Sequence, residues 1–220
     1  MPVTPSPILG LPRAVPGPED TPEAAVAWHF GDPLREQRAA VERVAVIDRS
    51  HRFVIAIGGP ERLSWLHTVS SQHIADMRDG DSAENLSLDA NGRVEHHFVL
   101  TDLDGTVWLD TESDTGPALL GFLQKMVFWA KAEPRDGNDH AVLSLLGPQA
   151  REVLPNLPSD DYRATPLPEL SGGSAGSARA GGFVRKMAWP TPDSYELVVP
   201  RAQLTEVWQR LVDRGATPAG

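Results

Sequence analysis

The stretch AENLSLDANGRVEHHFVLTDLDGTVWLD, residues 83–110, decides the fold class of this 220-residue chain. It contains three strand-like segments that are separated by Asp89-Ala90-Asn91-Gly92 and by Asp102-Leu103-Asp104-Gly105. Asn-Gly pairs accept the positive φ angles that tight hairpin turns require. The stretch therefore predicts an antiparallel meander of three strands.

Helical and strand-like segments alternate irregularly on both sides of this meander. Residues 53–57 read as a buried strand, and Leu204, Val207, Trp208 and Leu211 have the spacing of one helix face, with Gly215 as the helix end. Asp32 and Pro33 suit the start of another helix, in which Leu34 and Val41 are expected to face the core. Frequent hairpins without a regular βαβ rhythm favour an α+β fold of two β-rich subdomains with flanking helices.

The expected domain organisation has three parts. Residues 1–21 contain six prolines and are predicted to be a flexible leader. Residues 22–135 form a first subdomain, and residues 136–215 form a second α+β subdomain. The second subdomain contains a Gly/Ser/Ala-rich stretch, 171–182, which is typical of a flexible loop.

Composition excludes several functions. The formal net charge is −10 and no stretch concentrates Lys and Arg, so we expect no nucleic-acid partner. The chain has no cysteine, which excludes disulfides and thiolate metal ligands. No apolar run reaches the length of about 20 residues that a membrane helix needs, and no secretory signal is visible. These features predict a cytoplasmic protein without a membrane partner.

Two adjacent histidines are the most informative polar residues. His96 and His97 lie in one predicted strand, so their side chains point to opposite faces and cannot share a metal ion. His96 shares a face with Phe98 and Leu100 and is expected to be a hydrogen-bonded core residue, whereas His97 can contact a ligand. Gly-x-Ser-x-Gly and phosphate-loop motifs are absent. Residue patterns alone thus predict no catalytic set and no metal site.

Several segments, in this order, resemble the folate-binding family that unites glycine-cleavage T-proteins (aminomethyltransferases) and YgfZ-type iron–sulfur maintenance proteins. The resemblance covers about residues 31–215 and implies the fold of that family, with tetrahydrofolate as the ligand. The segments that carry it are Arg35–Ala40, Val46–Arg52, Gly58–His67, Leu88–Val94, Leu143–Ala150 and Asp193–Leu197.

Three departures from the family pattern affect the function that the resemblance implies. His96 and His97 stand where T-proteins carry two aspartates, and residues 191–193 replace a glutamate that grips the pterin. A neutral imidazole cannot replace a carboxylate against a basic amine. The chain also lacks the Lys-Gly-Cys-Tyr motif of YgfZ-type proteins and reads as cut short before it, without the family's C-terminal barrel. The first two departures favour the YgfZ-like branch.

The expected function is therefore folate binding in support of iron–sulfur cluster assembly or repair, with iron–sulfur proteins as possible partners. One alternative is an aminomethyltransferase-like enzyme that passes a one-carbon unit to tetrahydrofolate, and another is a non-catalytic partner or remnant that binds no folate. The resemblance implies a folate site formed by His97, Tyr195 and Arg52, in which Arg52 pairs with the ligand's glutamate tail.

Overall fold

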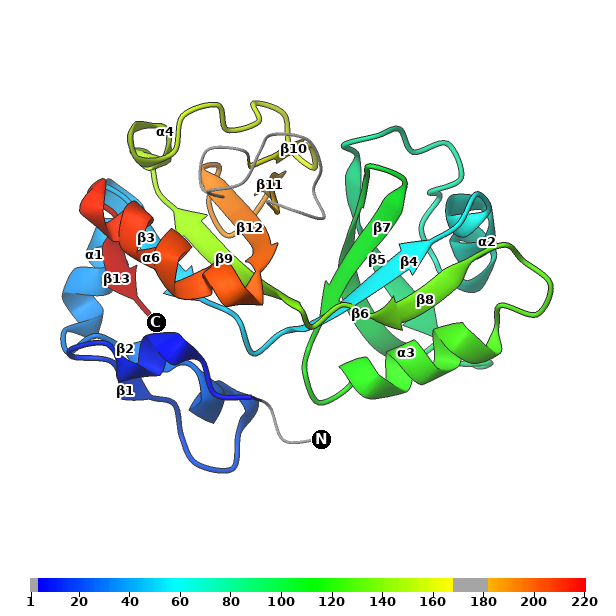
Figure 1. The fold of residues 1–220 in the computed structure, drawn as a ribbon, viewed down its shortest axis with the longest axis horizontal. Coiled ribbons are helices and arrows are strands. Elements are labelled where there is room, and N and C mark those ends of the chain that lie inside the picture. Colours follow the sequence, from blue (N-terminus) through cyan, green and yellow to red (C-terminus); the bar gives the residue numbers. More distant parts are fainter. Residues whose placement is uncertain (1–3, 168–181) are drawn as a thin grey trace. The chain divides into compact units, whose positions relative to one another are not determined.

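The computed structural model describes residues 4–167 and 182–220 and divides them into two compact units. One unit combines the described residues up to His51 with those from His140 onward, and the other comprises Arg52–Asp139. Both units contain a β-sheet with helices, so the predicted α+β class is confirmed (Figure 1).

The discontinuous unit is built on a six-stranded sheet in the order β10-β11-β12-β9-β3-β13. Neighbouring strands are antiparallel except for β13, which runs parallel to β3. A separate two-stranded sheet pairs β1 with β2. The strands of this unit are β1 (Val15–Pro16), β2 (Ala27–His29), β3 (Ala45–Asp48), β9 (His140–Leu146), β10 (Ala164–Pro166), β11 (Phe183–Met187), β12 (Ser194–Pro200) and β13 (Thr217–Ala219).

Helices of this unit supply one side of its core. Helix α6 buries Leu204, Val207, Trp208 and Leu211 against sheet residues, and Gly215 takes a left-handed φ of 107° just past the helix end. The sequence pattern predicted both features. The helices are α1 (Pro33–Glu42), α4 (Ala150–Val153), α6 (Leu204–Asp213) and the 3-10 turns η1 (Pro7–Gly10), η2 (Pro22–Ala25) and η3 (Arg201–Gln203).

The continuous unit contains a five-stranded antiparallel sheet in the order β5-β6-β7-β4-β8. The predicted meander forms β5, β6 and β7, and Gly92 in its first turn has a φ of 79°. The meander prediction is thus confirmed. The strands are β4 (Phe53–Gly58), β5 (Ser82–Leu88), β6 (Val94–Leu103), β7 (Thr106–Thr111) and β8 (Glu133–Asp136).

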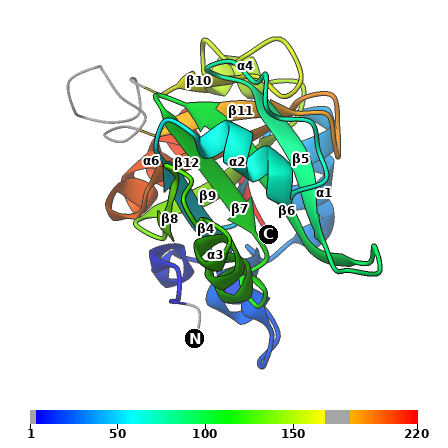
Figure 2. The same cartoon turned by 90° about the vertical axis from the view of Figure 1, so that its right-hand side faces the viewer.

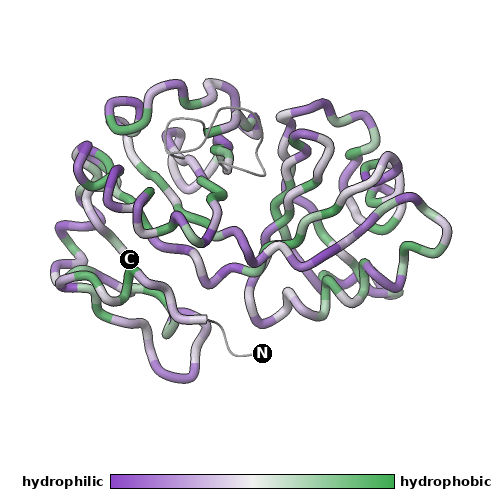
Figure 3. Tube along the Cα trace, in the orientation of Figure 1, coloured by the Kyte–Doolittle hydropathy of each residue, from purple (hydrophilic) through white to green (hydrophobic). Residues whose placement is uncertain are grey.

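Helices α2 (Arg62–Val69) and α3 (Gly116–Lys125) lie over the sheet of the continuous unit (Figure 2). Trp65, Leu66, Leu119 and Leu123 from these helices join one core cluster with strand residues. The cluster takes alternate residues of each strand, as a sheet with helices on one face requires. Its strand members include Ile55, Ile57, Phe98, Leu100, Val107 and Leu109. Hydrophobic stretches recur along the strands of both units (Figure 3).

The predicted domain boundaries need correction. Residues 22–135 do not form one subdomain, because β3 pairs with β9 and β13, and this pairing joins the first fifty residues to the C-terminal part. The predicted leader 1–21 is also wrong for its described part, since Ser6 caps η1 and Ile8 is fully buried in the core. The predicted loop 171–182 lies outside the described residues except for Gly182.

Helix α1 starts as predicted but turns a different face to the core. Asp32 caps it by accepting a hydrogen bond from the backbone N–H of Arg35 at 3.1 Å. Leu34 and Val41, expected to be buried, are 76% and 69% exposed, whereas Glu36 and Ala39 are buried. The buried face of this helix is therefore not its most apolar face.

Candidate functional site

Strand β6 directs its two histidines to opposite faces of the sheet in the continuous unit. Phe98 and Leu100 belong to the helix-covered core, and His96 shares their face by strand alternation. His97 lies on the other face, opposite Leu86 of β5 in the hairpin register. The sequence predicted this separation.

An imidazole–carboxylate pair occupies the face on which His97 lies. The Nε2 atom of His97 is 3.3 Å from the Oε2 atom of Glu84 on β5. Both side chains are accessible, with exposures of 43% for His97 and 31% for Glu84. The pair can offer a donor and an acceptor to a hydrogen-bonding ligand.

A buried arginine network lies on the same sheet face. Arg52 donates from Nε to Oδ2 of Asp110 at 2.6 Å and from an amino nitrogen to the carbonyl oxygen of Asp110 at 3.2 Å, and it also pairs with Glu112. The Arg52 and Asp110 side chains are only 5% and 2% exposed, whereas that of Glu112 is 55% exposed. The guanidinium expected to grip a ligand's carboxylate is therefore already held by carboxylates of the protein.

His96 differs from the expected hydrogen-bonded core residue. It is partly buried, and its Nδ1 atom has no hydrogen-bond partner in the part of the chain that the structure describes. Burial lowers the pKa of His96 from its ordinary value, and the neighbouring Glu95 carboxylate opposes this shift. Burial thus favours the neutral form of the imidazole.

Tyr195, the third predicted ligand residue, lies in the discontinuous unit on β12. Its side chain is 1% exposed and belongs to the core cluster together with Leu197 and Val199. Alternation places Glu196 on the other face, where it accepts a hydrogen bond from Arg185 at 2.9 Å and lies 3.5 Å from Arg49. The structure therefore places Tyr195 in the core, and its neighbour Glu196 is the polar residue that the sequence reasoning missed.

Sequence reasoning also missed Glu84, because a bulge separates it from the turn. The pairing of Leu88 with Val94 next to the turn would, if continued, place Asn85 opposite His97, but the register shifts between Ser87 and Leu88 so that Leu86 lies opposite His97. Glu84, two residues before Leu86, then shares the face of His97. Within residues 4–167 and 182–220, no group of three or more His, Asp or Glu side chains is arranged to hold a metal ion. No described helix is long and apolar enough to cross a membrane.

A family model described as the GCVT N-terminal domain matches residues 23–220. This chain belongs to that family. The family assignment agrees with the resemblance to T-proteins that the motifs indicated. The match itself does not distinguish YgfZ-type members from aminomethyltransferases.

Curated relatives of this GCVT-domain protein carry the name aminomethyltransferase. The protein from Alcanivorax borkumensis is 22% identical over 192 residues, and that from Stenotrophomonas maltophilia is 25% identical over 200 residues. Each alignment covers 87% of this chain and 53% of the relative. The GCVT-domain chain thus spans about half the length of the curated relatives it matches.

Solved structures support the fold of this GCVT-domain protein. Aminomethyltransferase T of the glycine cleavage system from Bartonella henselae superimposes with a TM-score of 0.80 at 18% identity, over 96% of this chain and 57% of that one. A chain of the heterotetrameric sarcosine oxidase from Corynebacterium sp. U-96 gives a TM-score of 0.57 at 17% identity, over 89% of this chain and 94% of that one. The fold therefore also occurs in a chain of similar extent.

Proposed function

We propose that this chain is a folate-binding protein of the aminomethyltransferase-like T-protein family. The observation that carries the proposal is the family match over residues 23–220, together with aminomethyltransferases as curated relatives. Tetrahydrofolate is the ligand that the resemblance implies. The proposal includes a cytoplasmic location for the protein.

Of the predicted site residues, His97 is the best suited to contact a folate, together with Glu84 beside it. A pterin ring presents both N–H donors and ring nitrogen acceptors, and the pair presents an imidazole beside a carboxylate, 3.3 Å apart. Arg52 and Tyr195 are poorly suited to contact a ligand, because both are nearly inaccessible. His97 is thus the primary ligand-contacting residue of the proposal.

Isothermal titration with a reduced folate tests this proposal. We expect a dissociation constant on the order of 0.1 mM, because side chains that remain half exposed enclose little of a ligand's surface. His97→Ala and Glu84→Gln should each weaken binding several-fold. His73→Ala is the matched control, since His73 and Asp76 form another exposed pair, at 3.2 Å, outside the site. Tight binding that His97→Ala leaves unchanged would show that the site is misplaced.

Whether the chain itself transfers a one-carbon unit is a separate question with its own test. The resemblance places two acids where this chain has His96 and His97, and burial favours the neutral form of His96. We therefore expect background activity with an aminomethylated lipoyl carrier and tetrahydrofolate. The same departure favours a second candidate function, a YgfZ-like role in iron–sulfur cluster assembly or repair. Robust turnover by the native chain would refute that candidate.

A third candidate is a non-catalytic subunit that binds no folate. The sarcosine oxidase chain favours it, because that chain is matched over 94% of its length and belongs to a heterotetramer. A flat folate titration with an intact cooperative unfolding transition would select this candidate over the first two.

A further inference from the structure

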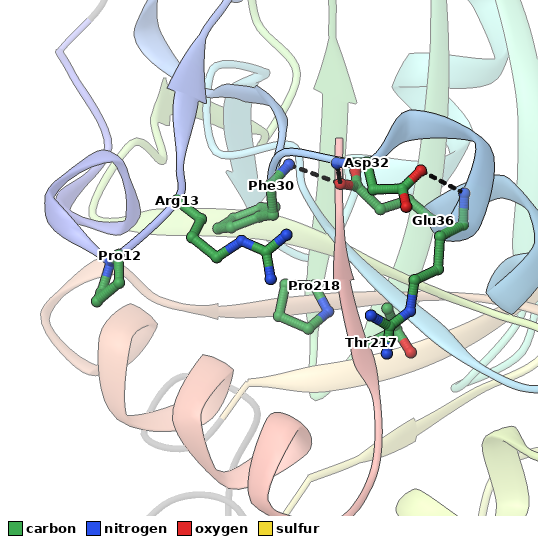
Figure 4. A pocket seen from close by; sticks show the side chains of 8 residues that line it. Pro12, Arg13, Phe30, Asp32, Glu36, Thr217 and Pro218 are labelled. Carbon is green, nitrogen blue, oxygen red and sulfur yellow. Dashed lines mark hydrogen bonds between the residues drawn. The ribbon is translucent and has the colours of Figure 1, made fainter.

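A small pocket in the discontinuous unit is lined by none of the residues discussed for folate. Its volume is about 180 Å³, and segments distant in the sequence converge on it. The close view shows charged side chains gathered beside an aromatic ring (Figure 4). The lining residues are Pro12, Arg13, Phe30, Asp32, Arg35, Glu36, Thr217 and Pro218.

The start of helix α1 builds the rigid part of this pocket. Oε1 of Glu36 accepts hydrogen bonds from the backbone N–H groups of Phe30 at 2.8 Å and Asp32 at 3.2 Å. The ring of Phe30 stacks on Trp208 of the core, with centroids 5.5 Å apart. Both the carboxylate and the aromatic wall are therefore fixed in place before any ligand arrives.

The second carboxylate oxygen of Glu36 is the unusual feature of the pocket. Glu36 is only 5% exposed, and its Oε2 atom is buried without a hydrogen-bond partner among the described residues. Burying a carboxyl oxygen without a hydrogen-bond partner costs free energy, because the lost hydration is not replaced. An N–H donor in the pocket would remove that cost.

Two arginines supply the opposite charge. Arg13 and Arg35 are both exposed, and no ion pair links either of them to another described residue. Arg13 has a left-handed φ of 70°, and its guanidinium lies over Gly31, where a Cβ atom would stand 3.2 Å from Nη2. A guanidinium that is not engaged by a protein carboxylate can bind one from a ligand.

We propose that this pocket binds a small zwitterion with one carboxylate and one ammonium group, of the size of a short amino acid. The ammonium donates to Oε2 of Glu36, the carboxylate pairs with Arg13 and Arg35, and the carbon chain lies against Phe30 and Pro218. A volume of about 180 Å³ corresponds to about six waters at about 30 Å³ each, which suits a ligand of about five to eight non-hydrogen atoms.

Binding requires a side-chain movement, because Oε2 of Glu36 is buried in this structure. Arg13 and Arg35 are long, exposed side chains, so they can rotate away from the mouth of the pocket and return onto the ligand's carboxylate. Glycine, β-alanine and 4-aminobutyrate differ in the length of the carbon chain between their two charges. The compound that binds most tightly therefore indicates the distance from Glu36 to the arginines in the bound state.

Amide chemical shifts from two-dimensional NMR of the full chain test the site, with each of these three compounds as the probe. We expect saturable shifts at Phe30, Gly31 and Asp32, with a dissociation constant in the millimolar range. Acetate and methylammonium, which carry one charge each, should bind at least about tenfold more weakly at the same ionic strength. The absence of saturation up to about 20 mM, or equal binding of acetate and the zwitterions, would overturn the proposal.

Two variants distinguish ligand binding by Glu36 from a purely structural role of this residue. Glu36→Gln keeps an oxygen for the N–H groups of Phe30 and Asp32 but places an amide at Oε2, so binding should weaken at least about tenfold. Arg13→Gln changes an exposed residue and tests the anionic end if Glu36→Gln fails to fold. Arg38→Gln, on the same helix but outside the pocket, is the control. Binding that survives both pocket substitutions unchanged would disprove the assignment.

Discussion

Truncation of Leu211 to alanine provides a sharp test of how the discontinuous unit is held together. Leu211 lies on α6, is fully buried and joins Leu204, Val207 and Trp208 in the core cluster. Leu34→Ala on α1 is the matched control, because it removes the same atoms from a side chain that is 76% exposed. The sequence pattern alone predicted that both leucines are buried.

The expected magnitude follows from the atoms removed. Leucine to alanine deletes three carbon atoms, and at about 0.8 kcal/mol per buried methylene their transfer costs about 2.4 kcal/mol. An unfilled cavity adds to this, so the free energy of unfolding should fall by about 2–5 kcal/mol. For a chain of this size, a loss of about 3 kcal/mol lowers Tm by about 6–12 °C. Leu34→Ala should change the free energy of unfolding by less than about 0.5 kcal/mol.

Chemical denaturation followed by circular dichroism, together with scanning calorimetry, measures both variants against the native chain. Calorimetry also shows whether the two units unfold in one transition or in two, which decides the transition to which the shift belongs. A Tm change of under a degree for Leu211→Ala would mean that α6 is frayed in solution. A larger effect of Leu34→Ala than of Leu211→Ala would refute the assignment of the buried face of α1.

Further predictions concern protonation, backbone conformation and exposed aromatic residues. Because burial lowers the pKa of His96, the folded state binds fewer protons than the unfolded state, so the free energy of unfolding should fall as pH drops through the ordinary value of 6.5. Urea titrations should show that the free energy of unfolding falls less between about pH 7.5 and about pH 5.5 for His96→Asn than for the native chain. An equal fall in both would show that His96 does not cause the pH dependence. Gly59→Ala should lower the Tm by more than Gly92→Ala. Both glycines have a positive φ, but of the two only Gly59 would place a Cβ atom against a backbone oxygen, that of Lys131, at 2.2 Å. Trp129→Ala should leave the free energy of unfolding unchanged, since Trp129 is 95% exposed. Trp208→Ala should lower it by about 3–5 kcal/mol, as measured by calorimetry. Comparable losses for the two variants would mean that Trp129 is covered in solution.

Local sequence patterns predicted those parts of the molecule whose cause is local. The Asn91-Gly92 turn forms because its residues accept positive φ, and the meander around it needs only neighbouring strands. The cap at Asp32 and the apolar face of α6 follow in the same way from spacing within a single helix. The separation of His96 from His97 required only the two-residue period of a strand. Such features depend on interactions between residues a few positions apart, so a short stretch of sequence is enough to predict them.

For the candidate site, sequence alternation separated the two faces of a strand but did not show which groups fill them. Alternation did not show that the core covers Tyr195 and not Glu196, because the covered face depends on α6 and η1, which lie far away in the chain. The sequence did not show that carboxylates of the protein hold Arg52, because its partners Asp110 and Glu112 follow it by about sixty residues. Glu84 shares the face of His97 only because the register shifts by one residue between Ser87 and Leu88, and the turn alone does not predict that shift.

The sequence by itself determined the strands, the hairpin turns, the strongest helix and the family to which its motifs belong. Tertiary structure alone decided that β3 joins β9 and β13, so that residues before His51 and after His140 share a core. It also decided that Leu34 is exposed while the charged Glu36 is buried in the same helix. The physical reason is that helix and strand periods arise from neighbouring residues, whereas burial and strand pairing arise from contacts between segments about a hundred residues apart, which no local pattern encodes.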